Sequence, residues 1–237
     1  MTLSVLKPNL NNIVSDMPAE INGVPPSRSK CILLSLQVQR IPFITARNLV
    51  VSHHYLHSIP GGTMLTFGVF LETRLMGAIV FGAGPQNGFR LVDGARTEDC
   101  LTLTRLWLTD ELPRNSESRV LGITIKAIQK YTSVKFLVSY SDPVQGHIGT
   151  IYQATNWLYT GLSTPMSLFD LGDGVARHSR SFAHAFGTRS ISYFKSHEMQ
   201  VHQLNQTGKY RYVYFLDKSW ATRLRPLVLP YPRKEPQ

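Results

Sequence analysis

The stretch from Ser141 to Gly161, SDPVQGHIGTIYQATNWLYTG, combines side chains that acid–base chemistry uses. An apolar run, FLVSYS, stops at Asp142 and a proline, and a loop with glycine and histidine follows. The next segment carries Tyr152 among Gln, Asn and Trp, where an ordinary core helix would carry Leu and Ala. A carboxylate at a strand end, faced by a tyrosine on the following helix, can move a proton at a reacting group. The alternative is that Asp142 only caps the turn before that helix.

Hydrophobic periodicity predicts the elements that would position these residues. Apolar runs typical of strands lie at 31–41, 64–72, 74–84, 100–110, 136–142, 157–162 and 210–216. Helices are predicted at 42–59, within 111–131 with Asn115 or Ser116 as the cap, at 147–156 and at 217–225. The runs at 64–72 and 74–84 are short-linked and predict an antiparallel hairpin. This order predicts the α/β class with a mixed sheet.

The length of the chain and the distribution of its prolines and polar residues predict three parts. The 237 residues are enough for one large domain with additions. Residues 1–30 are predicted to be an N-terminal extension, because prolines lie there among polar residues without a clear period. Residues 31–165 are the predicted core, and residues 166–237 are a basic C-terminal part packed on it.

The sequence predicts a cytoplasmic protein with no membrane partner. No apolar run is long enough to span a bilayer, and the N-terminus lacks the pattern of a secretory signal. Cys31 and Cys100 lie far apart within strand-like runs, so both are predicted to be reduced core residues.

The positive charge is concentrated near the C-terminus. The net charge of the chain is +10, and 11 Lys/Arg face only 3 Asp/Glu from Arg177 onward. Aromatic residues are interleaved with these basic ones. Basic side chains neutralise phosphates and aromatic rings stack on bases, so a nucleic-acid surface is one interpretation. A solvated basic face over an aromatic core is the other.

The order of the elements resembles the GCN5-related N-acetyltransferase fold. In that family a strand–loop–helix unit binds acyl-coenzyme A, and here the unit is LTRLWLTDELPRNSESRVLG (103–122). The resemblance implies that the strand lends backbone groups to the pantetheine, and that orphan amides at the helix start hold the pyrophosphate. The residues that this assigns to acyl-coenzyme A are Leu106, Leu108, Asn115, Ser116, Ser118 and Arg119. The loop lacks the glycines usual in that family, and its alternative interpretation is an ordinary capped helix.

Three blocks of sequence resemble the Mom family of bacteriophage DNA-modification proteins more specifically. They are HHYLHSIPGGT (53–63), LTRLWLTDELPRNSES (103–118) and SYSDPVQGHIGTIYQATNWLYTG (139–161). The resemblance implies conversion of adenine N6 in double-stranded DNA to a methylcarbamoyl-type adduct, which protects phage DNA from host restriction. It also implies an acetyl-coenzyme A or related acyl donor, a role for iron, and a place in the cytoplasm of a bacterial host.

Within this resemblance the polar residues acquire catalytic roles. Asp142 is the predicted general base for the adenine amine, and Tyr152 is an acid, an oxyanion donor or a ligand. Arg105 lies in the middle of an apolar strand, where a cation needs a partner because its desolvation costs roughly several kcal/mol. It is predicted to pair with Asp142 or to grip the acyl donor, and its alternative is a structural ion pair with a carboxylate such as Asp110.

The histidine-rich segment HHYLH allows a metal interpretation. By resemblance His54 and Tyr55, together with Asp142 and Tyr152, would form an oxygen-and-nitrogen site of a kind that iron accepts. His53 and His57 are four residues apart and are predicted to share a helical face. The alternative is that these histidines are polar residues satisfied near a helix end.

The segment DGVARHSRSFAHAFGTRS (173–190) is the predicted DNA contact, through Arg177, Arg180 and Arg189. The combined hypothesis is a DNA adenine modification enzyme of the acyltransferase type that swings its target base out of the duplex. One alternative is an acetyltransferase acting on a small amine or a protein, which would turn over without DNA. Another is a DNA-binding module without catalysis.

Overall fold

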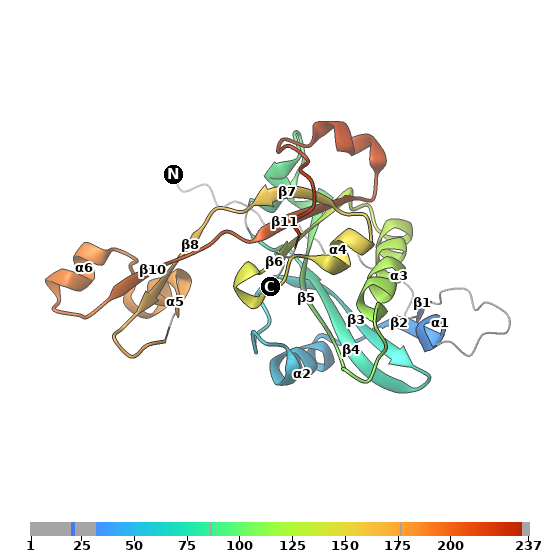
Figure 1. The fold of residues 1–237 in the computed structure, drawn as a ribbon, viewed down its shortest axis with the longest axis horizontal. Coiled ribbons are helices and arrows are strands. Elements are labelled where there is room, and N and C mark those ends of the chain that lie inside the picture. Colours follow the sequence, from blue (N-terminus) through green and yellow to red (C-terminus); the bar gives the residue numbers. More distant parts are fainter. Residues whose placement is uncertain (1–19, 22–31, 86, 176, 234–237) are drawn as a thin grey trace, which may run out of the picture. The chain divides into compact units, whose positions relative to one another are not determined.

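The computed structural model describes residues 20–21, 32–85, 87–175 and 177–233, and their central feature is an eight-stranded sheet (Figure 1). The strand order is β1-β2-β3-β4-β5-β6-β11-β7. The strands are β1 Glu20–Ile21, β2 Leu36–Arg40, β3 Thr63–Leu71, β4 Arg74–Gly82, β5 Cys100–Leu108, β6 Phe136–Ser141, β7 Leu158–Leu162 and β11 Tyr210–Phe215. The strands predicted from residue 64 onward are therefore confirmed.

The sheet mixes antiparallel and parallel pairs. Strands β2 to β5 run antiparallel to one another, and β3 and β4 are the predicted hairpin. Strands β5 and β6 are parallel, because helix α3 (Ser116–Tyr131) makes the crossover between them. This arrangement confirms the predicted α/β class with a mixed sheet.

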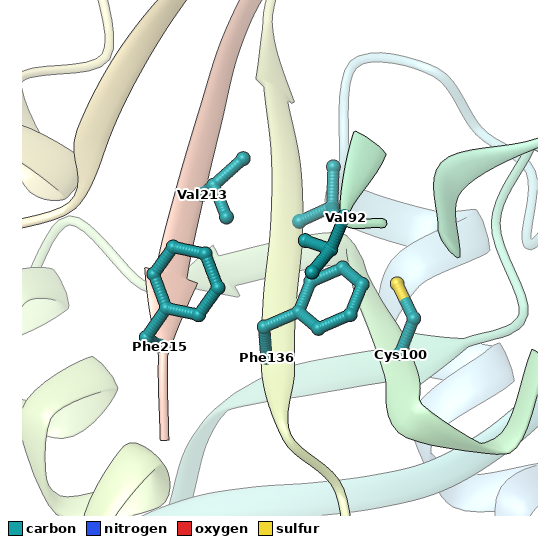
Figure 2. Close-up of a cluster of buried hydrophobic side chains, with 6 residues drawn as sticks. Val92, Cys100, Phe136, Val213 and Phe215 are labelled. Carbon is teal, nitrogen blue, oxygen red and sulfur yellow. The ribbon is translucent and has the colours of Figure 1, made fainter. Parts of the chain in front are cut away.

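Helices and short turns cover the sheet with apolar side chains. Helix α2 (Phe43–His53) packs Ala46 and Val50 against Ala78 and Val80 of β4. Helix α3 buries its apolar stripe and contacts β2 and β5. Figure 2 shows another cluster, which joins β5, β6 and β11 through side chains at these positions: Val92, Cys100, Phe136, Val213 and Phe215. The core thus holds together strands that are far apart in the sequence.

The two predicted core cysteines have different outcomes. Cys100 is buried with a free thiol, and burial raises the pKa of that thiol. Its prediction as a reduced core residue is confirmed. Cys31 lies outside the described residues.

Some predicted boundaries are corrected by the structure. The run 31–41 is not one strand, because Ile32–Ser35 form the short helix α1 before β2. Strand β3 turns back after Leu71, which pairs with Leu36, so the residues before Leu36 have no β3 partner. The helix predicted at 217–225 is a 3-10 helix over Lys218–Arg223. Helix α4 covers only Thr150–Ala154, since it begins after the left-handed Gly149.

A second compact unit contains Ser141–Ile148 and Leu162–Tyr210, and we call Leu162–Tyr210 the arm. The arm holds a three-stranded sheet with the order β10-β8-β9 and two helices (Figure 1). Its elements are β8 Met166–Asp170, β9 Arg177–His178, α5 Ser179–Phe186, α6 Ile191–Ser196 and β10 His202–Gln206. The larger unit contains the described residues up to Tyr140, together with Gly149–Gly161 and Arg211–Arg233. The predicted division of the chain at residue 165 stays a prediction.

In the part of the chain that the structure describes, no helix combines the length and the apolar character needed to cross a membrane.

Candidate functional site

Strands β5 and β6 separate part of the way along their length. Their pairing runs only from Cys100 and Phe136 to Leu103 and Ser139, whereas β5 continues to Leu108 and stays paired with β4 on its other side. Beyond Leu103, one edge of β5 has no strand partner among the described strands. Leu106 and Leu108, predicted to bind the acyl donor, lie on this opened part. Free backbone groups on such an edge can hydrogen-bond an extended ligand.

A cavity of about 350 Å³ lies between the β5–α3 loop, the first turn of α3, and α4. Its lining includes Asn115, Ser116 and Ser118, which the sequence assigned to the donor. Asn115 occupies the N-cap of α3 in the left-handed conformation (φ 71°), and its side chain makes no capping hydrogen bond. The Ser116 N–H already donates to the Pro113 carbonyl at 3.3 Å, so the amides of Glu117 and Ser118 are the first-turn donors beside the cavity without a side-chain cap, an arrangement suited to an anion.

The two loop serines brace the turn instead of facing the cavity with free hydroxyls. Ser116 Oγ donates to the Pro113 carbonyl at 2.6 Å, and Ser118 Oγ donates to the Asn115 carbonyl at 3.0 Å. These bonds stabilise the loop conformation and so fix the positions of its backbone amides. Arg119 behaves differently, because its Nε is buried without a hydrogen-bond partner among the described residues. An unpaired buried donor costs free energy unless a ligand or water satisfies it.

Tyr152 lies on α4 inside an aromatic cluster. Its ring packs against Trp157 at 5.2 Å and Tyr212 at 5.0 Å between centroids. Gly149 is needed at the start of α4, because a Cβ there would lie 2.4 Å from the Tyr212 ring and φ is +78°. The close approach of α4 to β11 therefore depends on this glycine.

The hydroxyl of Tyr152 reaches the point where β5 and β6 separate. It lies 2.8 Å from Ser139 Oγ, which is also 3.0 Å from the carbonyl of Leu103. Burial raises the pKa of Tyr152 to about 12, against the smaller lowering effect of the Ser139 bond. The phenol therefore keeps its proton at neutral pH and serves as a hydrogen-bond donor or acid, not as a phenolate.

Arg105 is held by neutral oxygen atoms. Its Nε donates to the Ser58 carbonyl at 2.8 Å, and a terminal nitrogen donates to the Thr104 carbonyl at 2.7 Å. No carboxylate of the larger unit's described residues forms an ion pair with it, so the alternative pairing with Asp110 is wrong. Burial lowers the pKa of Arg105, and the nearby Tyr55 opposes this effect. Tyr55 also raises the pKa of Tyr152, so Tyr55 lies within electrostatic range of both Arg105 and Tyr152.

Two of the residues predicted to hold iron, His54 and Tyr152, make hydrogen bonds within the larger unit, and the iron site stays a prediction. His54 Nδ1 accepts the backbone N–H of Leu56 at 3.1 Å, so a neutral ring carries its proton on Nε2 and has no free lone pair there. The phenol of Tyr152 is protonated and hydrogen-bonded. Among the described residues, no group of three or more His, Cys, Asp or Glu side chains is placed to hold a metal.

The prediction that His53 and His57 share a helical face is wrong. Helix α2 ends at His53, and His54 is extended, so His53 and His57 do not share a helical face. His53 instead stacks on Trp107 of β5 at 4.5 Å between ring centroids. The histidines of this segment are therefore satisfied by local contacts, as the alternative interpretation held.

Asp142 belongs to the smaller unit and does cap the turn after β6. Its Oδ1 accepts the backbone N–H of Val144 at 3.1 Å, which confirms the capping alternative. It is also buried, with 5% exposure, and its Oδ2 lies 3.0 Å from Nζ of Lys209. Capping and a catalytic role are compatible, but a joint action with Tyr152 or Arg105 of the larger unit stays a prediction.

The arginines predicted to contact DNA all lie on the arm. Arg177 in β9 forms an ion pair with Asp173, with one hydrogen bond of 2.8 Å. Arg189 is exposed before α6. Arg180 lies in α5, and its side chain falls outside the described residues. Their DNA contact stays a prediction.

Two functional candidates were missed by sequence reasoning. Ser139 is a small polar residue in a buried strand, and that interruption of the apolar pattern was an available signal. Lys209 precedes an apolar strand like many surface lysines, and nothing local marks it as the partner of a residue 67 positions away.

Comparisons with known proteins agree with the resemblance drawn from the three sequence blocks. A model of the Mom protein family matches residues 35–233. The protein named methylcarbamoylase mom of Escherichia phage Mu is 33% identical over 208 residues, which are 84% of each chain.

Solved structures resemble the chain more distantly. A ribosomal L7/L12 alpha-N-protein acetyltransferase aligns with a TM-score of 0.43 and 9% identity, covering 81% of this chain and 97% of that one. A probable acetyltransferase of the GNAT family from Chromobacterium violaceum aligns with a TM-score of 0.44 and 8% identity, covering 86% and 93%. No conclusion about activity follows at such scores.

Proposed function

The chain belongs to the Mom protein family, and from that premise we propose that it is an enzyme that modifies adenine N6 in double-stranded DNA. The adduct is of the methylcarbamoyl type, formed when the adenine amine displaces the coenzyme A thiol from an acyl-coenzyme A donor whose acyl group already carries the methylamino nitrogen. It protects phage DNA from restriction in the cytoplasm of a bacterial host. The observation that carries this proposal is the 33% identity to the phage Mu methylcarbamoylase over 84% of both chains.

The opened edge of β5 and the cavity at α3 support the donor part of the proposal. The pantetheine would extend along Leu106 and Leu108, and its pyrophosphate would meet the first-turn amides of α3. Arg119 would pair with a phosphate, because a charge-assisted bond satisfies its buried Nε. Asn115, Ser116 and Ser118 would shape the loop through the contacts described above.

The polar groups support proton handling at the adenine amine. That amine is a weak nucleophile because its lone pair is delocalised into the ring, so a carboxylate such as Asp142 would accept its proton during attack. Tyr152, protonated at neutral pH, would donate to developing negative charge. Arg105 would bind an anionic part of the donor. No step is routed through iron.

The arm supports double-stranded DNA as the substrate. Arg177, Arg180 and Arg189 would contact phosphates on either side of the target base, which must leave the stack to present its amine. Phosphate contacts position the protein without reading sequence. The arm would therefore supply binding to duplex DNA without sequence preference.

Mass spectrometry of nucleosides from plasmid DNA tests the proposal. Plasmid is prepared from bacteria that express the wild-type chain or the Asp142→Ala variant, and we expect a heavier deoxyadenosine only with the wild type. The same adduct in both cultures would leave the enzyme proposal standing and remove Asp142 as its base. No modified adenine in either culture, with soluble protein present, would favour an acetyltransferase of small amines or proteins, or a DNA-binding module without catalysis.

A further inference from the structure

Asp142 is a buried carboxylate whose oxygen atoms all have partners in the smaller unit. Oδ1 accepts from Val144 N at 3.1 Å, and the backbone carbonyl accepts from Gln145 N and His147 N, each at 3.1 Å. Oδ2 is left for Lys209, whose Nζ lies 3.0 Å away. The backbone bonds shape the loop, and Lys209 supplies the positive charge that a buried carboxylate requires.

Lys209 itself is fixed at the base of the arm. Its N–H donates to Ser163 Oγ at 2.9 Å, and its carbonyl accepts from Ser163 N at 2.8 Å. The preceding Gly208 is buried, and a Cβ there would lie 2.1 Å from the Ser163 carbonyl oxygen. The two ends of the arm are therefore fastened to each other at the residue that carries the lysine.

These contacts place the proposed base and the proposed DNA contacts in one compact unit. The loop Ser141–Ile148 clusters with the arm, and the Lys209–Asp142 ion pair joins them. Because the N–H and the carbonyl of Lys209 are both hydrogen-bonded to Ser163, its side chain approaches the Asp142 carboxylate from one direction. Loss of the lysine would leave the carboxylate buried without its cation, with only the Val144 N–H to fix its orientation.

We propose that Lys209 is a positioning residue, which holds the Asp142 carboxylate in its reactive orientation by fastening the Ser141–Ile148 loop to the base of the arm. The inference rests on the proposed function, because it takes Asp142 as the base. It assigns Lys209 no contact with DNA or with the acyl donor.

The test compares purified wild type with Lys209→Met, Lys209→Arg and the control Lys126→Met, an exposed lysine on the outer side of α3. Initial rates of adenine modification are measured against the concentration of duplex DNA. We expect Lys209→Met to lower kcat about tenfold or more with the KM for DNA within about twofold. Lys209→Arg should recover most of kcat, and Lys126→Met should match the wild type.

Other kinetic outcomes would overturn the inference. An unchanged kcat in Lys209→Met would show that the ion pair has no part in the reaction. A raised KM for DNA with an unchanged kcat would identify Lys209 as a phosphate contact instead.

Hydrogen exchange separates this inference from the proposed function. The amides of Val144 and His147 donate to Asp142, so their protection reports the state of the loop whether or not DNA is modified. We expect Lys209→Met to lose protection at both amides and Lys209→Arg to keep it. Equal protection in all variants would overturn the inference. A wild type with protected amides and no adenine modification would refute only the proposed function.

A double-mutant cycle covers the case in which Lys209→Met folds poorly. Asp142→Asn removes the charge that Lys209 neutralises, so Lys209→Met should shift the urea midpoint much less in that background than alone. An equal shift in both backgrounds would show that the lysine acts independently of Asp142 and would overturn the inference.

Discussion

Asp142 and Tyr152 are ten residues apart and are both buried, but different forces keep each of them inside. Asp142 lies in the smaller unit with its charge paired to Lys209 and its loop held by backbone hydrogen bonds. Tyr152 lies in the larger unit in an aromatic cluster, and burial holds its phenol neutral. An ion pair stabilises buried Asp142, and aromatic packing stabilises buried Tyr152.

This difference separates the two proposed catalytic roles. A carboxylate can accept a proton, whereas the buried phenol of Tyr152 keeps its proton at neutral pH and can donate it. Four experiments test the contrast, beginning with the largest expected effect.

Asp142→Asn should remove the negative charge that distinguishes Asp142 from the neutral phenol of Tyr152. The amide oxygen can still accept from Val144 N, so folding should be preserved while adenine modification falls about a thousandfold. The measurement is the initial rate on duplex DNA, with Asp93→Asn as a matched control, in which an aspartate paired with Arg225 is neutralised instead. A rate close to that of the wild type would remove Asp142 from the chemistry.

Phe182→Ala should unfold the arm and leave the larger unit folded. Phe182 is 1% exposed and packs against Phe169 and Phe194, so its loss should cost about 3–5 kcal/mol. Urea unfolding followed by hydrogen exchange should show early loss of protection in the arm and unchanged protection in β3 and β4. Simultaneous loss in both units would show that they fold as one.

Tyr152→Phe should change how stability depends on alkaline pH. The folded-state pKa is about 12 against an ordinary value of 10.0, so the unfolded chain releases this proton first and the free energy of unfolding falls as pH rises. The phenylalanine variant lacks this ionisable group, so its free energy of unfolding should decrease by about 1 kcal/mol less than that of the wild type between roughly pH 9 and 11. Urea unfolding at the two pH values measures this, and identical declines would contradict the buried, protonated phenol.

Arg189→Ala and Arg177→Ala should weaken DNA binding unequally. Arg189 is exposed, so its loss should reduce the slope of log affinity against log salt by about one. Arg177 is already paired with Asp173, which competes with phosphate, so its loss should change the slope less. Fluorescence anisotropy with a labelled duplex at several salt concentrations measures both. Unchanged slopes would place the DNA surface elsewhere on the chain.

Local sequence patterns predicted the elements near the site because their signals are local. The hairpin at β3 and β4 follows from two apolar runs with a short link, and α3 follows from its 3.6-residue period. The prediction that His53 and His57 share a helical face was wrong for the same reason. Periodicity alone extended α2 past His53, where the chain turns into an extended conformation that no local residue marks.

The site itself was only partly predictable. The sequence indicated Asp142 and Tyr152 because each is a polar side chain next to, or in place of, the apolar residues expected there. The Ser139 contact with Tyr152 and the neutral partners of Arg105 depend on strands that pair at a distance in the sequence. The sequence predicted a charged partner for Arg105, whereas the structure offers the carbonyl of Ser58, 47 residues away.

The sequence by itself determined the α/β class, the family and the acidic and aromatic residues that the chemistry would need, since these depend on residue type and short-range order. Only the tertiary structure decided that Lys209 meets Asp142, that the phenol of Tyr152 is buried, and that β5 and β6 separate after Leu103. Burial and ion pairing depend on which distant segments come together. No residue encodes them alone, and the reactivity of each side chain follows from them.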